Sequence, residues 1–226
     1  AMFQGYTQGA VDFLWGLKLN NERPWFQAHK EEFLALVDRP TRELAAQLTQ
    51  AMTDAYPKFG LELKVSRIYR DARRLFGRGP YKDHLWFSLR KPGEQDGAIP
   101  CFWFEIAAER YGYGMGCWEL PPATMAKLRA RIDRDPKPLE KLVRAIGKRG
   151  EFRLGGPEYK RPKGDPGPLL YPWYNRKQIS LECEHNCEGV FFTPDLAGQV
   201  LEGWKSLTPI YQYVCSLPGD PEPAHI

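Results

Sequence analysis

The sequence predicts a single α+β domain in which helices cover one face of an antiparallel sheet of about four or more strands. Three observations lead to this prediction. Segments with helical periodicity lie toward both ends of the chain, and segments with strand-like patterns lie between them. The strand-like segments also follow one another without an intervening helix. Strands connected in this way pair most simply as antiparallel neighbours.

The N-terminal part of the chain is predicted to be helical. Apolar residues at three- and four-residue steps indicate one helix around residues 11–17 and a second over residues 25–37. Pro24 fits the first turn of the second helix, where its missing N–H costs nothing. Pro40 is expected to end that helix and to open a third, which runs to Ala55.

The middle of the chain is predicted to form the sheet. Residues 61–65 alternate apolar and polar side chains, which is the pattern of a half-buried strand. Aromatic and β-branched residues predict three further strands over residues 84–90, 99–107 and 111–120. The loop 91–100 is long enough for an antiparallel connection. Glycines alternate within the last of these strands, which either makes room for large neighbours or lets a ligand approach.

The C-terminal part returns to helices. Two are expected over residues 121–132 and 135–150, followed by an irregular stretch rich in Gly and Pro and a short strand near residues 178–184. Thr193 is the expected cap of a last helix, which Pro209 should bend or split. No linker separates two domains, so residues 3–216 are predicted to form one domain and residues 217–226 a mobile tail.

Composition limits the classes of function. The chain has 226 residues, of which 42% are hydrophobic and 13% aromatic, as expected for a folded globule. The formal charge of +4 does not by itself require a nucleic-acid or membrane partner. No apolar run is long enough to cross a bilayer, and five cysteines, an odd number, do not form a disulfide framework. These features predict a cytoplasmic protein without a membrane partner.

The segment 66–84, SRIYRDARRLFGRGPYKDH, is the strongest functional signal in the sequence. It contains five arginines and two glycines. Guanidinium groups bind phosphate or carboxylate oxygens in pairs, and glycines let a ligand approach the backbone closely. We therefore predict a site for a small anionic ligand. Its candidate ligand-binding residues are Arg67, Arg70, Asp71, Arg73, Tyr81, Lys82 and His84.

Two alternatives remain open for this segment. A nucleic-acid-binding module would use the same cations together with interleaved aromatic rings such as Tyr69 and Phe76, although the small net charge argues against it. A structural or interaction protein would instead pair the arginines internally. In that case each of Arg67, Arg70 and Arg73 would face its own carboxylate, and no cleft would lie beside them.

Several common kinds of catalytic and cofactor site have no support in the sequence. The chain lacks a Walker loop, a dinucleotide fingerprint and a Gly-x-Ser-x-Gly elbow. Cys183, His185 and Cys187 lie within five residues of one another, but this is not a standard zinc spacing. No metal and no cofactor are therefore predicted. The sequence names no catalytic residue and leaves open whether the protein is an enzyme.

Two motifs give a resemblance to a known family. The first consists of Phe13, Leu14, Leu17, Asn20, Asn21, Trp25, Phe26 and Lys30, and the second of Arg70, Asp71, Arg73, Pro80, Tyr81 and Lys82. In this order they resemble the family catalogued as domain of unknown function 2461, over roughly residues 3–214. The family has no established reaction, so the resemblance implies membership and not an activity. It also implies that both motifs belong to one common core.

Overall fold

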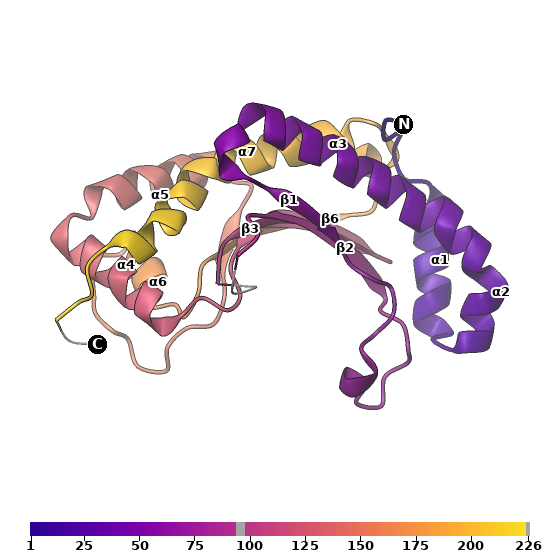
Figure 1. Cartoon of the computed structure of the whole chain (residues 1–226), viewed down its shortest axis with the longest axis horizontal. Helices are drawn as coiled ribbons and strands as arrows, with labels where there is room; N and C mark the ends of the chain where they lie inside the picture. Colours follow the sequence, from indigo (N-terminus) through magenta and orange to yellow (C-terminus); the bar gives the residue numbers. More distant parts are fainter. Residues whose placement is uncertain (94–97, 225–226) are drawn as a thin grey trace. The chain divides into compact units, whose positions relative to one another are not determined.

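The computed structural model describes residues 1–93 and 98–224 (Figure 1). The predicted α+β class is confirmed, because six strands form one antiparallel sheet in the order β1-β2-β3-β4-β6-β5 and are accompanied by helices. The strands are β1 (Glu62–Val65), β2 (His84–Arg90), β3 (Cys101–Ala107), β4 (Arg110–Gly116), β5 (Arg153–Gly155) and β6 (Ser180–Asn186). The middle of the predicted loop 91–100 and the last two residues of the predicted tail lie outside the described residues.

The chain divides into two compact units. The first contains Ala1–Arg90, Trp103–Tyr113 and Glu184–Glu202, and the second contains Lys91–Phe102, Gly114–Cys183 and Gly203–Ile226. The predicted domain limits of residues 3–216 stay a prediction. All residues of the candidate site lie in the first unit.

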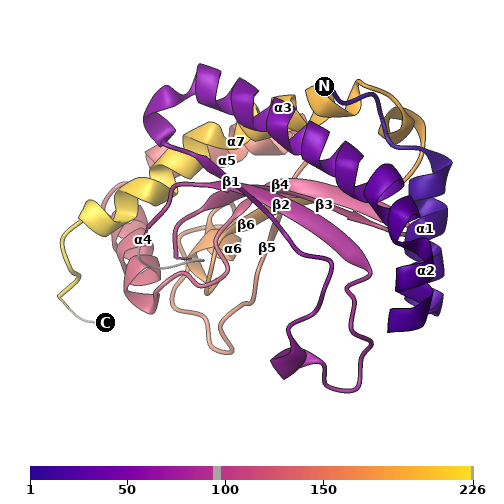
Figure 2. The ribbon, with the colours of Figure 1, turned by 45° about the vertical axis from the view of Figure 1, so that its right-hand side comes forward.

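The first unit begins with α1 (Gln8–Leu19), α2 (Arg23–Phe33) and α3 (Arg39–Ala55). The expectation that Pro40 ends a helix is wrong, because a π-helical turn, η1 (Leu34–Asp38), carries α2 directly into α3 (Figure 2). A π turn bonds each N–H one residue further back than an α-helix does. We attribute the continuity to this wider turn, which accommodates a residue that has no N–H to donate.

Strand β2 illustrates how the first unit builds its core. Its Leu85 and Phe87 are buried on one face, and the Phe87 ring lies 5.3 Å from that of Phe104 on β3. Helix α3 contacts β1 on the covered side of the sheet (Figure 1). His84 and Trp86 alternate with the buried pair and are only half-buried. The loop between β1 and β2 extends away from α3 (Figure 2).

The second unit contains α4 (Pro122–Arg134), α5 (Lys137–Arg149), α6 (Tyr171–Tyr174) and most of α7 (Leu196–Ser216). The sequence predicted that Pro209 would bend or split the last helix. Helix α7 is not split there. A proline at this position leaves the carbonyl of Lys205 without its usual helical donor. The Thr208 hydroxyl donates to that carbonyl at 2.8 Å, so the lost bond is replaced.

The segment expected to be irregular, residues 155–177, contains α6, and β5 ends at its first residue. Asn175 organises it, because its Oδ1 accepts from the Lys163 N–H at 2.6 Å and its Nδ2 donates to the Gly164 carbonyl at 3.0 Å. Beyond α7, Asp220 forms two hydrogen bonds of 2.6 and 2.7 Å with the Arg131 guanidinium. The mobility of the tail stays a prediction.

The alternating glycines of β4 favour the packing alternative. A Cβ at Gly114 would overlap the Leu181 carbonyl oxygen of β6, and one at Gly116 would lie 2.9 Å from the carbonyl oxygen of Ile179. Backbone of the neighbouring segment therefore occupies the space that side chains at these positions would need.

Candidate functional site

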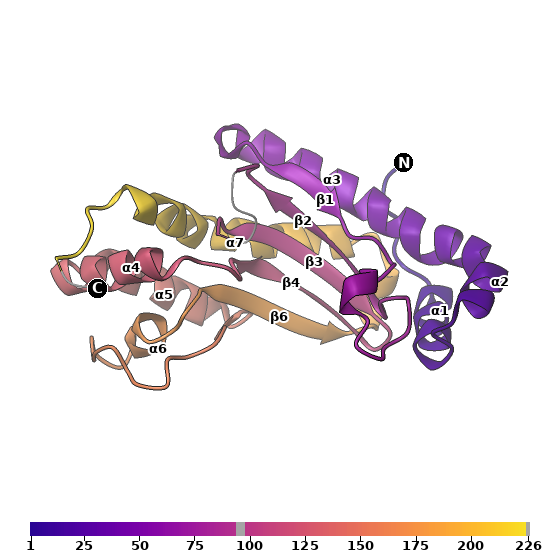
Figure 3. The same ribbon diagram turned by 60° about the horizontal axis from the view of Figure 1, so that its bottom comes forward.

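The segment 66–83 between β1 and β2 forms a long hairpin. Its two legs are paired, because the Arg70 N–H donates to the Pro80 carbonyl at 2.8 Å and the Lys82 N–H donates to the Ile68 carbonyl at 2.7 Å. A short helical turn, η3 (Ala72–Arg74), lies near its tip (Figure 3). The hairpin thus extends the β1–β2 ladder beyond the sheet and gives its side chains fixed positions.

The α1–α2 connection holds this hairpin. The Asn21 Nδ2 donates to the Tyr81 carbonyl at 2.8 Å, and the Asn21 Oδ1 accepts from the Tyr81 N–H at 2.9 Å. Gly79 lies so close that a Cβ there would overlap the Asn21 side chain. The Tyr81 ring is buried and stacks on Phe26 at 4.2 Å between ring centroids. Tyr81 therefore anchors the hairpin and does not line the cleft described next.

A cleft of about 1040 Å³ opens between the hairpin and the ends of β1 and β2. Seven Lys and Arg side chains and His84 line it, against two aspartates. The charged residues in its lining are Lys64, Arg67, Arg70, Asp71, Arg73, Arg74, Arg78, Lys82, Asp83 and His84. The structure thus brings six of the seven predicted site residues together on one concave surface and leaves out Tyr81.

Arg73 is the arginine of this cleft that has its own carboxylate. Its guanidinium donates to both Asp71 oxygens, at 2.7 and 3.0 Å, and its backbone N–H donates to the same carboxylate at 3.0 Å. These side-chain and backbone hydrogen bonds lower the pKa of Asp71 to about 2. Both side chains are exposed, so the pair balances charge more than it stabilises the fold.

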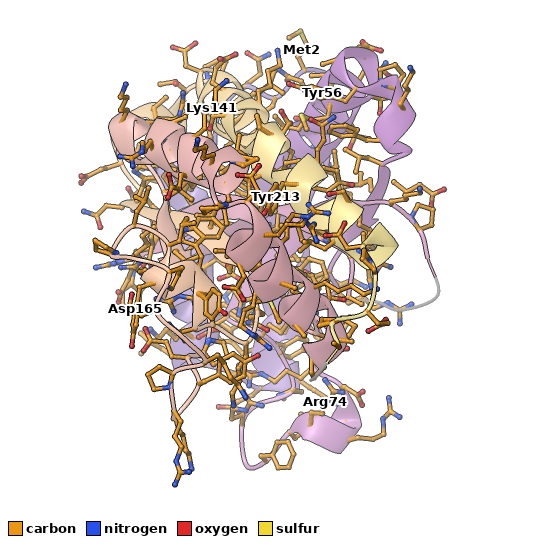
Figure 4. All side chains as sticks on the ribbon, turned by 90° about the vertical axis from the view of Figure 1, so that its left-hand side faces the viewer. Met2, Tyr56, Arg74, Lys141, Asp165 and Tyr213 are labelled. Carbon is orange, nitrogen blue, oxygen red and sulfur yellow. The ribbon has the colours of Figure 1, made fainter. Side chains whose placement is uncertain are left out.

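The other arginines are not paired in this way. Among the residues that the structure describes, no carboxylate lies within ion-pair distance of Arg67, Arg70 or Arg74. Arg70 donates through Nε to the Tyr81 carbonyl at 2.7 Å, which fixes the guanidinium at the cleft wall. Figure 4 shows Arg74 on the outer turn of the hairpin. Arg78 donates to backbone carbonyls of the same turn.

Lys82 is held against the wall of the cleft. Its Nζ donates to the Arg67 carbonyl at 2.7 Å, which leaves two further N–H groups on the ammonium. Burial lowers the pKa of Lys82, and the charge of Arg70 lowers it further. Cations are thus close enough to repel one another here, and an anion between them would relieve this repulsion.

Acid–base groups lie at the β2 end of the cleft. The His84 Nδ1 is 3.0 Å from the Asp83 Oδ1, and this hydrogen bond lowers the pKa of Asp83. Glu105 on β3 does not line the cleft but interacts with these two groups. Burial raises the pKa of Glu105; the charge of His84 opposes this rise, and the charges of Asp83 and Glu184 add to it. Sequence reasoning did not select Glu105. A usable signal was its position in β3, where a carboxylate alternates with the buried Phe104 and Ile106.

The comparison with protein families shows which family the chain matches. The family described as "Conserved hypothetical protein (DUF2461)" matches residues 9–213. The chain belongs to this family. The resemblance seen in the sequence is therefore confirmed, and the two motifs that suggested it meet in space where Asn21 of the first bonds Tyr81 of the second. A comparison with curated proteins gave no significant match.

The remaining sequence candidates lie apart from the cleft. His185 stacks on Tyr111 at 5.3 Å, and Cys187 donates through its Sγ to the Ala107 carbonyl. Over residues 1–93 and 98–224, no group of three or more His, Cys, Asp and Glu is placed to hold a metal ion, and no helix is both long and apolar enough to cross a membrane. That the protein uses no metal or cofactor stays a prediction.

Proposed function

We propose that this protein binds a small phosphate- or carboxylate-bearing ligand in the cationic cleft of its β1–β2 hairpin. One observation carries the proposal. Arg67, Arg70 and Arg74 lie around one concave surface without a carboxylate partner among the described residues. Like charges that are not neutralised repel one another in the cleft and so destabilise the folded state. A bound polyanion turns this repulsion into attraction, so the same charges then stabilise it.

The internal-pairing alternative fits the geometry less well. It requires a carboxylate against each of Arg67, Arg70 and Arg73 and no cleft beside them. Only Arg73 has such a partner among the described residues, and a cleft is present. The nucleic-acid alternative is favoured by one feature, the exposed aromatic rings on the basic hairpin, of which Phe76 is 82% exposed and Tyr69 49%.

Thermal shift in the presence of anions tests the proposal. Sulfate, phosphate and citrate at millimolar concentration should raise the melting temperature above that in chloride of equal ionic strength, because a ligand that binds only the folded state stabilises it. No shift with any of them, and no ordered anion in soaked crystals, would contradict it. A short oligonucleotide that binds with steep salt dependence, while small anions do not bind, would favour the nucleic-acid alternative.

The cytoplasm remains the compartment that we propose. None of the five cysteines is joined to another in a disulfide, which fits a reducing environment. Fractionation of the producing cells followed by immunodetection tests this, and recovery in an oxidising compartment would contradict it.

A further inference from the structure

Two aromatic rings line the cleft, although a bare anion would not need them. Tyr69 and Trp86 belong to its wall. Tyr69 is 49% exposed, yet its ring is packed at 5.3 Å from that of Tyr81 and at 6.0 Å from that of Phe26. A ring fixed on one side and open on the other loses little conformational freedom when a planar group stacks on it.

The backbone of Trp86 is held by the strand ladder. Its backbone N–H donates to the Ser66 Oγ at 2.9 Å, and its carbonyl accepts from the Ser66 N–H at 2.8 Å. Its side chain alternates with those of the buried Leu85 and Phe87, so it belongs to the face of β2 away from the core. The cleft therefore combines a partly apolar wall with its cations.

The charge of the cleft exceeds what one phosphate can neutralise. Among the described residues, the cations that line it without a carboxylate partner are Arg67, Arg70, Arg74, Arg78 and Lys82. A single phosphate monoester carries a charge of at most about −2. The volume of about 1040 Å³ is also at the upper end of what small-molecule sites offer. The number of these cations fits a ligand with a chain of phosphates. The volume leaves room for a second group beside them.

We propose that the cleft binds a nucleotide with two or more phosphates, with the phosphates among the arginines and Lys82 and the base stacked on Tyr69. This inference rests on the proposed function and narrows its ligand to one chemical class. The phosphates supply the charge that the hairpin leaves uncompensated. The base covers the open face of Tyr69, and Trp86 adds an apolar part to the lining of the same cleft.

Isothermal titration with ATP and with inorganic tripolyphosphate, both in EDTA, tests the proposal. The two ligands carry similar charge, so their difference in affinity measures what the nucleoside adds. We expect ATP to bind about tenfold more tightly or better, as stacking of a base on an aromatic side chain provides. This comparison uses the unmodified protein and does not depend on the folding of any variant.

Variants of Tyr69 test whether the base stacks on this residue. Tyr69→Leu should remove the advantage of ATP and leave tripolyphosphate binding unchanged, whereas Tyr69→Phe should preserve both. Phe76→Leu is the matched control, because Phe76 is an exposed ring of the same hairpin that does not line the cleft. It should change neither affinity. Unchanged tripolyphosphate binding in Tyr69→Leu also shows that the cleft is still formed.

The outcomes separate this inference from the proposed function. Equal affinity for ATP and tripolyphosphate would overturn the nucleotide and leave anion binding intact. Binding of neither, nor of sulfate, phosphate or citrate, would overturn both. An advantage of ATP that survives Tyr69→Leu would overturn the placement of the base. If a single-stranded oligothymidylate binds with steep salt dependence while ATP does not bind, the ligand is a nucleic acid and not a nucleotide.

Discussion

Asn21 and Tyr81, which are 60 residues apart in the sequence, are joined by two hydrogen bonds from one side-chain amide. The amide of Asn21 donates and accepts as the backbone of a neighbouring strand would. It therefore joins the edge of the hairpin to the α1–α2 connection. Both the backbone N–H and the backbone carbonyl of Tyr81 are hydrogen-bonded as a result. Through this contact the helical part of the first unit sets the position of the cationic segment.

Asn21→Ala should lower the free energy of unfolding by about 2 kcal/mol, because the Tyr81 N–H loses its partner in a partly buried place and the Tyr81 carbonyl keeps only its bond from Arg70. Urea denaturation followed by circular dichroism measures this. Asn20→Ala is the control, since the Asn20 amide makes a single bond to the Gly16 carbonyl at the end of α1. It should cost about 1 kcal/mol or less. Equal losses in the two variants would contradict a special role for Asn21.

Gly79→Ala should destabilise the protein by about 1–3 kcal/mol, because its Cβ would overlap the side chain and backbone of Asn21. Gly147→Ala provides the opposite control. Gly147 lies inside α5 with nothing within 4 Å of an added Cβ, so alanine there should stabilise by roughly 0.5–1 kcal/mol. The same denaturation assay compares them, and a neutral Gly79→Ala would show that the contact can relax.

Hydrophobic periodicity predicted many of the helices and strands, because the spacing of buried side chains differs between the two kinds of element. The pattern of residues 84–90 gave β2 with both bounds correct, and residues 61–65 gave β1 to within one residue. The errors arose where a non-local or unusual bond replaced the expected one. The π turn before Pro40 and the hydroxyl bond of Thr208 both preserve helices that a proline was expected to interrupt.

The candidate site was less accessible from sequence than the fold. Charge density selected the segment 66–84, but a one-dimensional pattern does not say which side chains share a surface. It grouped Tyr81 with the cations, whereas the Tyr81 ring packs on Phe26. It also missed Lys64, whose place in the cleft follows from the β1–β2 register.

Arg67→Gln and Arg73→Gln should differ in their effect on anion affinity. Arg67 has no carboxylate partner among the described residues, so its loss should weaken tripolyphosphate binding by about tenfold or more. Asp71 already balances Arg73, and that variant should lose only about twofold to threefold. Titration calorimetry measures both affinities, and a larger loss for Arg73→Gln would contradict the assignment.

Asp71→Asn completes this comparison. It removes the carboxylate that occupies Arg73 and so should strengthen tripolyphosphate binding, by about twofold to fivefold. Weaker binding in this variant would mean that Asp71 serves the site by holding Arg73 in place.

Lys82 should make anion affinity fall at a lower pH than an ordinary lysine would. Burial and the charge of Arg70 lower its pKa, so the ammonium loses its proton earlier as the pH rises. Sulfate keeps a constant charge between about pH 7 and about pH 10, and its affinity should decline across this range. Lys82→Arg should flatten the profile, because a guanidinium stays protonated. An equal decline in both proteins would assign the titration to another group.

Glu105→Gln should stabilise the protein at about pH 8 and much less at about pH 4. Burial raises the pKa of Glu105, so between the ordinary and the raised value the folded state binds more protons than the unfolded state. Stability therefore falls as the pH rises through that window, and the loss is complete above it. Glutamine does not ionise and avoids this loss, whereas at low pH Glu105 is protonated in both states and the advantage shrinks.

Melting temperatures of the two proteins at both pH values measure the effect, with Glu32→Gln on the exposed surface of α2 as a control that should change little. A stabilisation of equal size at both pH values would show that the gain comes from packing and not from the charge of Glu105.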